Sequence, residues 1–75
     1  MKIEILGSGC PNCETLYAHT QSALAQKGLT AEVVKVNDMA TILGYGVMKT
    51  PGLVIDGKVR ISGRVPTVAE IAALL

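Results

Sequence analysis

The feature that most constrains the fold is a change of hydrophobic period close to the N-terminus. Within residues 2–6, Ile3, Ile5 and Leu6 are apolar and Glu4 is an acidic interruption, and the segment runs into Gly7-Ser8-Gly9. This pattern predicts a short strand that ends at a glycine turn. Across residues 11–27 the apolar side chains instead return every three to four positions, which predicts a helix. Pro11 suits the first helical position because its missing N–H is not needed there.

A second strand is predicted at residues 31–36, because Val33, Val34 and Val36 favour extended structure. Two successive strands that are joined by a helix run parallel, and this crossover is right-handed in nearly all known cases. We therefore expect the helix at residues 11–27 to cover one face of a sheet.

The rest of the chain predicts a helix, a hairpin and a final helix. Asn37 or Asp38 can cap a short helix over residues 39–45. Asp56-Gly57 is a two-residue hairpin signal between strands at residues 53–55 and 58–62.

In the second of these strands, charged side chains alternate with Val59 and Ile61, which we expect to point inward. Thr67 and Glu70 have the spacing of a capping box for the last helix. The element order is therefore βαβ followed by αββα, in a single domain that spans residues 1–75.

Composition limits the classes of partner. The 75 residues are 49% hydrophobic and carry a net charge of +1. Lys58, Arg60 and Arg64 are expected to lie along a solvated edge strand, and no run of basic residues resembles a nucleic-acid-binding arm. No apolar segment is long enough for a signal peptide or a membrane span. We therefore expect a cytoplasmic protein with no nucleic-acid or membrane partner.

Cys10 and Cys13 stand where the predicted strand, turn and helix meet. Cys10 would be the N-cap, where unpaired backbone N–H groups and the positive end of the helix dipole favour a thiolate. Cys13 lies one turn further on, so the two sulfurs can form and break a disulfide with little backbone movement. Closing so short a loop would stabilise the fold by only about 2 kcal/mol. The pair therefore suits redox chemistry better than it suits a structural cross-link.

Metal binding is the alternative from another functional class. A structural zinc site needs four ligands, whereas this chain offers two cysteines and His19, which we expect on the polar side of the helix. Two thiolates can hold a soft ion such as Cu(I), and a zinc site could be shared between two copies. Heavy-metal-associated domains of this length, including metallochaperones, also place C-x-x-C after their first strand, but they run βαββαβ and end on a strand.

Three features together give the chain a family resemblance over its whole length. They are the motif Cys10-Pro11-Asn12-Cys13 at a strand-to-helix turn, Thr50-Pro51 before a hairpin, and Gly63 after the last strand. With these features the chain resembles thioredoxin-fold proteins, and in size it is similar to the small glutaredoxin-like redox-active disulfide proteins of archaea and bacteria. The resemblance implies an α/β thioredoxin fold of minimal type, with a four-stranded mixed sheet and helices on both faces. It also implies a thiol–disulfide oxidoreductase that needs no cofactor besides a redox-active Cys10–Cys13 disulfide.

The resemblance assigns roles to single residues of the motifs. Cys10 would attack the substrate disulfide and Cys13 would resolve the mixed disulfide. Thr50 would pair its backbone with the bound substrate chain, beside Pro51 in a cis peptide bond. The two residues between the cysteines, Pro11 and Asn12, would face the substrate as well.

Glu4 has two interpretations. It lies six residues before Cys10, the spacing at which thioredoxins carry a buried acid that assists proton transfer from the resolving thiol. The interpretation that we favour is a solvated carboxylate on a half-exposed strand.

The expected partners follow from the resemblance and from the departures from it. The resemblance implies a monomer that reacts with disulfide-containing proteins and with an electron donor similar to thioredoxin reductase. Lys49-Thr50-Pro51 replaces the Thr-Val-Pro that frames the glutathione site of glutaredoxins, and Arg64 replaces the second glycine of their Gly-Gly pair. These departures argue against glutathione binding.

Overall fold

A computed structural model of the chain describes residues 1–7 and 11–75. Along the described residues the elements are β1 (Lys2–Leu6), α1 (Pro11–Lys27), β2 (Glu32–Val36), α2 (Met39–Gly44), β3 (Gly52–Ile55), β4 (Lys58–Ser62) and α3 (Val68–Leu74). This order confirms the predicted βαβ and αββα halves. Ser8, Gly9 and Cys10 lie outside the described residues. None of the described helices has the length and apolar character needed to cross a membrane.

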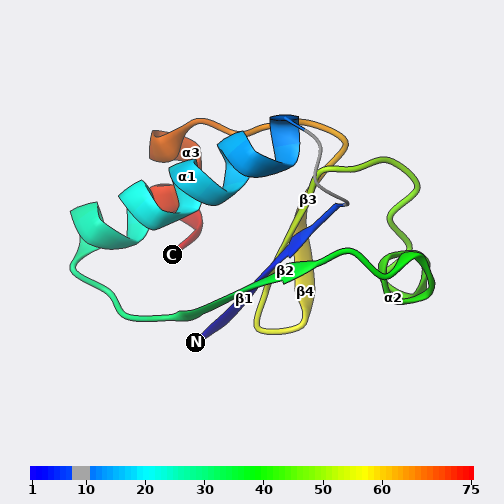
Figure 1. The fold of residues 1–75 in the computed structure, drawn as a ribbon. Helices are drawn as coiled ribbons and strands as arrows, with labels where there is room; N and C mark the ends of the chain where they lie inside the picture. Colours follow the sequence, from blue (N-terminus) through cyan, green and yellow to red (C-terminus); the bar gives the residue numbers. More distant parts are fainter. Residues whose placement is uncertain (8–10) are drawn as a thin grey trace.

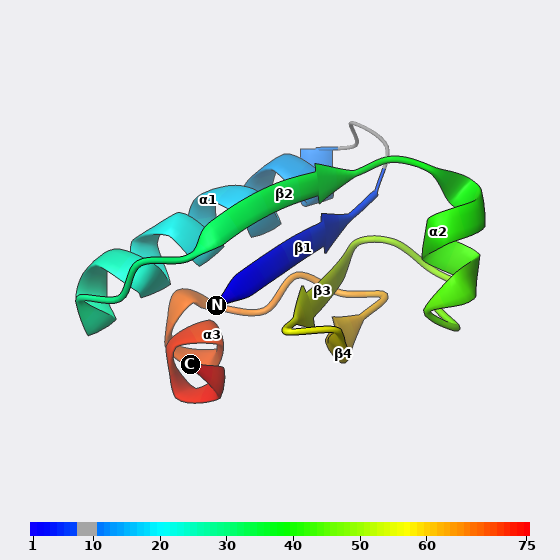
Figure 2. The same ribbon diagram turned by 90° about the horizontal axis from the view of Figure 1, so that it is seen from below.

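The four strands form one mixed sheet in the order β2-β1-β3-β4. The central strand β1 runs parallel to β2 and antiparallel to β3, and β3 pairs with β4 as a hairpin. Figure 2 shows that β1 and β2 point toward the end of the molecule where α2 lies. Because β4 is an edge strand, Lys58 and Arg60 lie where charged side chains protect an open edge, as expected.

The two faces of the sheet carry separate cores. Ile3 and Ile5 of β1 pack with Leu16 of α1 and Ile71 of α3 on one face, and Figure 1 shows α1 and α3 together on that side. Side chains alternate between faces along a strand, so Leu6 points the other way. It packs there in a smaller cluster with buried residues of α2, the following loop and β3: Ile42, Val47 and Val54. Helices therefore pack on both faces, as the resemblance implied, and α2 does so through its buried Ile42 near one end of the sheet.

The hairpin between β3 and β4 has the predicted turn but not the predicted alternation. Asp56 and Gly57 both have positive φ, 49° and 82°, which is the geometry of a type I′ turn. The pairing of β3 and β4 shifts between Leu53 and Val54, because an extra residue on β4 forms a bulge. The expectation that Val59 points inward is therefore wrong, and Val59 is exposed.

His19, which we expect on the polar side of α1, is partly buried in the structure and has a hydrogen-bond partner. Its Nδ1 donates a hydrogen bond of 2.9 Å to the carbonyl of Pro66, in the segment that leads into α3. The reason is that α1 and α3 lie side by side, so the flank of α1 toward α3 is partly covered. His19 therefore links two helices.

The capping box predicted for the last helix is present. The Thr67 hydroxyl accepts a hydrogen bond from the Glu70 N–H at 3.1 Å, and Glu70 Oε1 accepts one from the Thr67 N–H at 3.2 Å. This cap fixes the start of α3, and so it helps to hold Ile71 in the core.

We expect Thr67→Ala to lower the free energy of unfolding by about 1 kcal/mol, because the substitution removes the side-chain acceptor of the cap. Urea denaturation measures this change. Thr30→Ala is the matched control, since Thr30 is exposed between α1 and β2 and should change stability by less than about 0.5 kcal/mol. Equal effects of the two substitutions would contradict a stabilising role for the cap.

Candidate functional site

Gly7, directly after β1, lies against Cys13 in the first turn of α1. A side-chain carbon placed on Gly7 would collide with Cys13 Sγ, and it would lie 3.6 Å from Cβ of Thr50. Gly7 also has a φ of 153°, a conformation that residues with side chains rarely adopt. The contact brings together three segments that are far apart in the sequence: the end of β1, the start of α1 and the loop before β3.

The motif residues in the first turn of α1 differ in their exposure to solvent. Pro11 and Asn12 are exposed, whereas the side chain of Cys13 is buried. Pro11 occupies the first helical position as predicted, and its carbonyl accepts a hydrogen bond of 3.0 Å from the Thr15 hydroxyl. The helix therefore presents Pro11 and Asn12 to an approaching molecule and keeps the sulfur of Cys13 on its inner side.

The loop before β3 carries the second predicted part of the site. The Thr50–Pro51 peptide bond is cis, which confirms what the resemblance implied. Pro51 is fully buried, and its carbonyl accepts a hydrogen bond of 2.9 Å from the N–H of Gly63. Thr50 itself is exposed. The loop is thus fixed to the end of β4 and presents Thr50 at the surface near Cys13.

An ion pair lies beside the motif on the outer side of α1. Lys35 of β2 places its Nζ 3.3 Å from both carboxylate oxygens of Glu14 and 4.6 Å from the centre of the Tyr17 ring. Both charged side chains are more than half exposed, so the pair adds little to stability. The ion pair acts on the local charge, because Lys35 offsets the negative charge of Glu14, the residue that follows Cys13.

The carboxylate of Glu4 is not solvated, so the interpretation favoured from sequence is wrong. The side chain is 14% exposed, and it accepts a hydrogen bond from the hydroxyl of Tyr45, the residue that caps the C-terminus of α2. Lys2 Nζ lies 3.8 Å from the other carboxylate oxygen. Glu4 points to the same side of β1 as Leu6, because alternate residues of a strand share a face. It therefore faces α2, whereas α1 with Cys13 packs on the opposite face.

The structure brings together only part of the site expected from sequence. Cys13, Thr50 and Pro51 converge at one end of the sheet, and Cys10 lies outside the described residues. The contacts recorded for Glu4 join it to α2 instead. Sequence reasoning did not assign Gly7 to the site, although a glycine that directly follows a strand could have signalled a close approach of the backbone. Within residues 1–7 and 11–75, no group of three or more His, Cys, Asp or Glu side chains could hold a metal ion.

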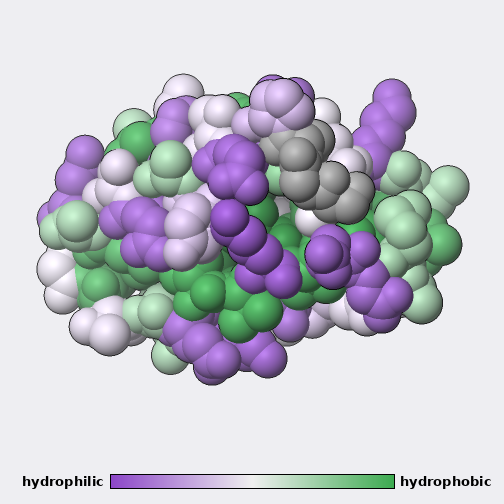
Figure 3. Space-filling model, in the orientation of Figure 1, coloured by the Kyte–Doolittle hydropathy of each residue, from purple (hydrophilic) through white to green (hydrophobic). Residues whose placement is uncertain are grey.

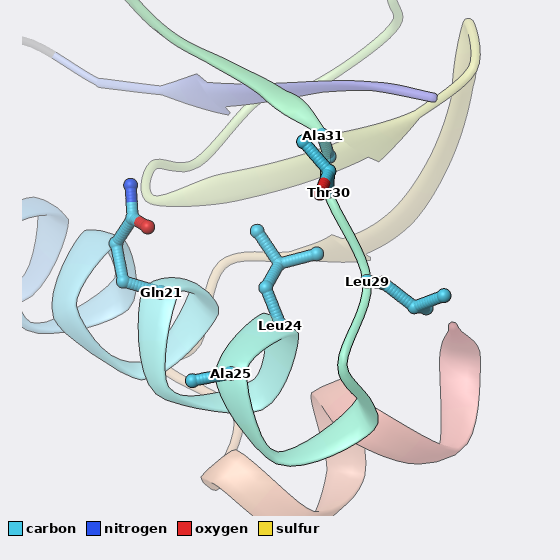
Figure 4. A pocket seen from close by; sticks show the side chains of 6 residues that line it. All are labelled: Gln21, Leu24, Ala25, Leu29, Thr30 and Ala31. Atoms are coloured by element: carbon cyan, nitrogen blue, oxygen red, sulfur yellow. The ribbon is translucent and has the colours of Figure 1, made fainter.

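A shallow pocket of about 290 Å³ lies away from this site, between the C-terminal part of α1 and the segment entering β2. In Figure 4, Leu24 points from α1 toward Thr30 and Ala31. The lining carries no charged residue and consists of Gln21, Leu24, Ala25, Leu29, Thr30 and Ala31. Because α1 is about 25 Å long, this pocket lies far from Cys13 at the other end of the helix.

Comparisons with known proteins agree with this geometry. The model of the thioredoxin domain family matches residues 1–75. A thioredoxin of Methanothermobacter thermautotrophicus is 41% identical over 75 residues, which cover 100% of this chain and 97% of the relative. A thioredoxin of Methanocaldococcus jannaschii is 39% identical over 69 residues, which cover 92% of this chain and 79% of the relative.

The contact between Gly7 and Cys13 predicts a contrast between two glycine substitutions. Gly7→Ala should lower the free energy of unfolding by about 1–3 kcal/mol, because the added methyl group overpacks the site and the backbone conformation disfavours a side chain. Gly44→Ala is the control: Gly44 ends α2 with open space around it, so alanine should be neutral or stabilising. Urea denaturation measures the stability of the two variants. An unchanged stability for Gly7→Ala would contradict a close contact that leaves no space for a methyl group.

The contact between Tyr45 and Glu4 predicts that the Tyr45 hydroxyl titrates at a higher pH than an ordinary tyrosine. The hydrogen bond to Glu4 holds the pKa of Tyr45 above its usual value of 10.0, with smaller contributions from burial and from the Glu4 charge. Because the folded-state pKa is raised, the stability from this contact is complete below the unfolded pKa and is lost as pH rises through the folded pKa.

Absorbance at 295 nm measures tyrosine ionisation, and subtracting the titration of Tyr45→Phe isolates Tyr45. Glu4→Gln should lower the midpoint of Tyr45 toward 10.0, because the carboxylate that stabilises the protonated phenol is gone. The same midpoint with glutamate and with glutamine would contradict the contact.

Proposed function

Because the chain belongs to the thioredoxin domain family, we propose that it is a thiol–disulfide oxidoreductase whose reacting groups are Cys10 and Cys13. The observation that carries this proposal is the packing of Cys13 against Gly7, next to the loop with Thr50 and cis Pro51. A buried sulfur with an exposed backbone segment beside it suits a reaction in which an extended chain is held while sulfurs exchange.

The helix N-terminus supports the assignment of the attacking thiol. Since α1 begins at Pro11, Cys10 is the residue that directly precedes the helix in the chain. Backbone N–H groups and the helix dipole favour a thiolate at such a position. Cys13 belongs to the helix and is buried, which suits the thiol that reacts second.

In the proposed reaction, the Cys10 thiolate attacks one sulfur of a substrate disulfide. A mixed disulfide forms, and the other substrate sulfur leaves as a thiolate and takes up a proton. Cys13 then loses its proton and attacks Cys10, which forms the Cys10–Cys13 disulfide and releases the second substrate thiol. Two electrons pass from the protein to the substrate, so a donor must reduce the protein again.

Glu4 has a different role in this proposal from the buried acid of thioredoxins. Its carboxylate holds Tyr45 and faces α2, on the side of the sheet opposite to α1. We therefore propose that Glu4 fixes α2 to the central strand and that the proton of Cys13 leaves through water. Glu4→Gln should then leave the pH dependence of the second step unchanged.

We further propose that protein disulfides are the substrates and that a reductase similar to thioredoxin reductase is the electron donor. The exposed Thr50 supports a protein substrate, because its backbone can pair with an extended chain. At the position of the second glycine of glutaredoxins, Arg64 forms an ion pair of 2.9 Å with Glu70, which argues against a glutathione site. We propose that the protein acts as a monomer in the cytoplasm.

The test is reduction of insulin and of a small aromatic disulfide by the reduced protein. We expect the parent to reduce both, Cys10→Ser to reduce neither, and Cys13→Ser to accumulate a mixed disulfide that mass spectrometry detects. If Cys13→Ser releases substrate as fast as the parent, the roles of the two cysteines are wrong.

Competition with a Cu(I) chelator tests the metal-binding alternative on the same sample. Tight stoichiometric Cu(I) binding without disulfide exchange would replace the proposed function by metal handling. The element order does not favour that outcome, since a helix, α2, stands between β2 and β3, where the βαββαβ order has two strands in succession.

A further inference from the structure

Three large apolar side chains are exposed on α2 and on the loop that follows it. Met39 is 59% exposed, Leu43 is 53% exposed and Met48 is 86% exposed, and we call these three residues the apolar patch. Met39 and Leu43 are four positions apart on α2, so they share one side of the helix. No charged residue occurs from position 39 to position 48. Figure 3 shows apolar side chains gathered at this end of the molecule, on the right.

The most exposed of the three, Met48, is held by a fixed backbone. Val47 before it is buried against Leu6, and Pro51 after it is fully buried. The loop is therefore anchored on both sides of a side chain that points into solvent. A methionine on such a loop is an adaptable apolar contact, because its unbranched side chain can repack around different partners.

The apolar patch adjoins the site at which the proposed reaction takes place. Met48 is two residues before Thr50, and Thr50 lies next to Gly7 and Cys13. A protein whose disulfide reaches Cys10 and whose chain pairs with Thr50 would therefore bring the residues beside its cysteine onto the patch.

The residue between the patch and Thr50 adds a positive charge. Lys49 is exposed and lies beside Gly63. A side-chain carbon placed on Gly63 would be 3.4 Å from Cβ of Lys49. The ion pairs among the described residues join other groups, so no carboxylate there neutralises Lys49. A partner with an acidic side chain next to its apolar one would complement both features.

We propose that Met39, Leu43 and Met48, together with Lys49, form the docking surface for a disulfide-bearing protein whose reactive cysteine is flanked by a large apolar residue and an acidic one. This inference rests on the proposed function and adds the substrate class. The apolar contact would supply most of the affinity, whereas Lys49 would supply selectivity and a dependence on salt.

The test uses two synthetic peptides, each joined by a disulfide to a fluorescent thiol. In one peptide leucine and aspartate flank the cysteine, and in the other both flanking residues are serine. The parent should reduce the first peptide roughly tenfold more efficiently, as kcat/KM, with the difference mainly in KM.

Variants assign this preference to residues. Met48→Ser and Leu43→Ser should each reduce the preference about 3–10-fold. Lys49→Gln should remove the part of the preference that comes from the aspartate of the peptide. In the parent, that part should weaken as the salt concentration rises. Leu29→Ser is the matched control, since Leu29 is an exposed apolar residue at the distant pocket and should leave the preference unchanged. Urea denaturation of each variant shows whether a loss of preference comes from weaker docking or from a less stable fold.

Two results would overturn the docking surface while the proposed function stands: no preference in the parent, or the same preference in Met48→Ser, Leu43→Ser and Leu29→Ser. A binding measurement keeps the two proposals distinguishable. The leucine–aspartate peptide with serine in place of cysteine cannot exchange, yet it should shift the methyl NMR signals of Met39 and Met48. If these signals move but neither peptide is reduced, the reaction is wrong and the surface is right.

Discussion

The rest of the structure depends on one close approach, that of the backbone at Gly7 to the sulfur of Cys13. Strand β1 lies at the centre of the sheet, and α1 covers one face of it. These two elements meet with no space for a side chain between them. The third partner, the loop before β3, is fixed there because Pro51 is buried and its carbonyl is bonded to Gly63. The site is therefore built by close packing of backbone segments.

In this arrangement the two faces of the sheet hold different parts of the molecule. On one face, Ile3 and Ile5 pack with α1 and α3 and form the larger core. On the other face, Leu6 and Val47 hold α2 and the loop that leads to Thr50. The aliphatic clusters supply the stability, so the fold does not depend on a cross-link between the cysteines that we propose to react.

Local sequence signals predicted the elements well, and long-range contacts explain what they missed. The helix from Pro11, the turn at Asp56-Gly57 and the cap at Thr67 follow from a few neighbouring residues each. By contrast, the hydrogen bond between Tyr45 and Glu4 spans 41 positions, and that between His19 and Pro66 spans 47. Hydrophobic period places a residue on a face but does not show which segment will cover it. The cis bond at Pro51 was predicted by the family resemblance, since local sequence alone favours trans.

The separation of the two cores has a consequence for spectroscopy. The chain has no tryptophan and no phenylalanine, and its two tyrosines lie on opposite sides of the sheet. Tyr17 packs against the core under α1, and Tyr45 packs against the core under α2. Intrinsic fluorescence therefore contains one reporter for each core. A variant that keeps a single tyrosine would show whether the two halves loosen together or in turn when the protein is heated.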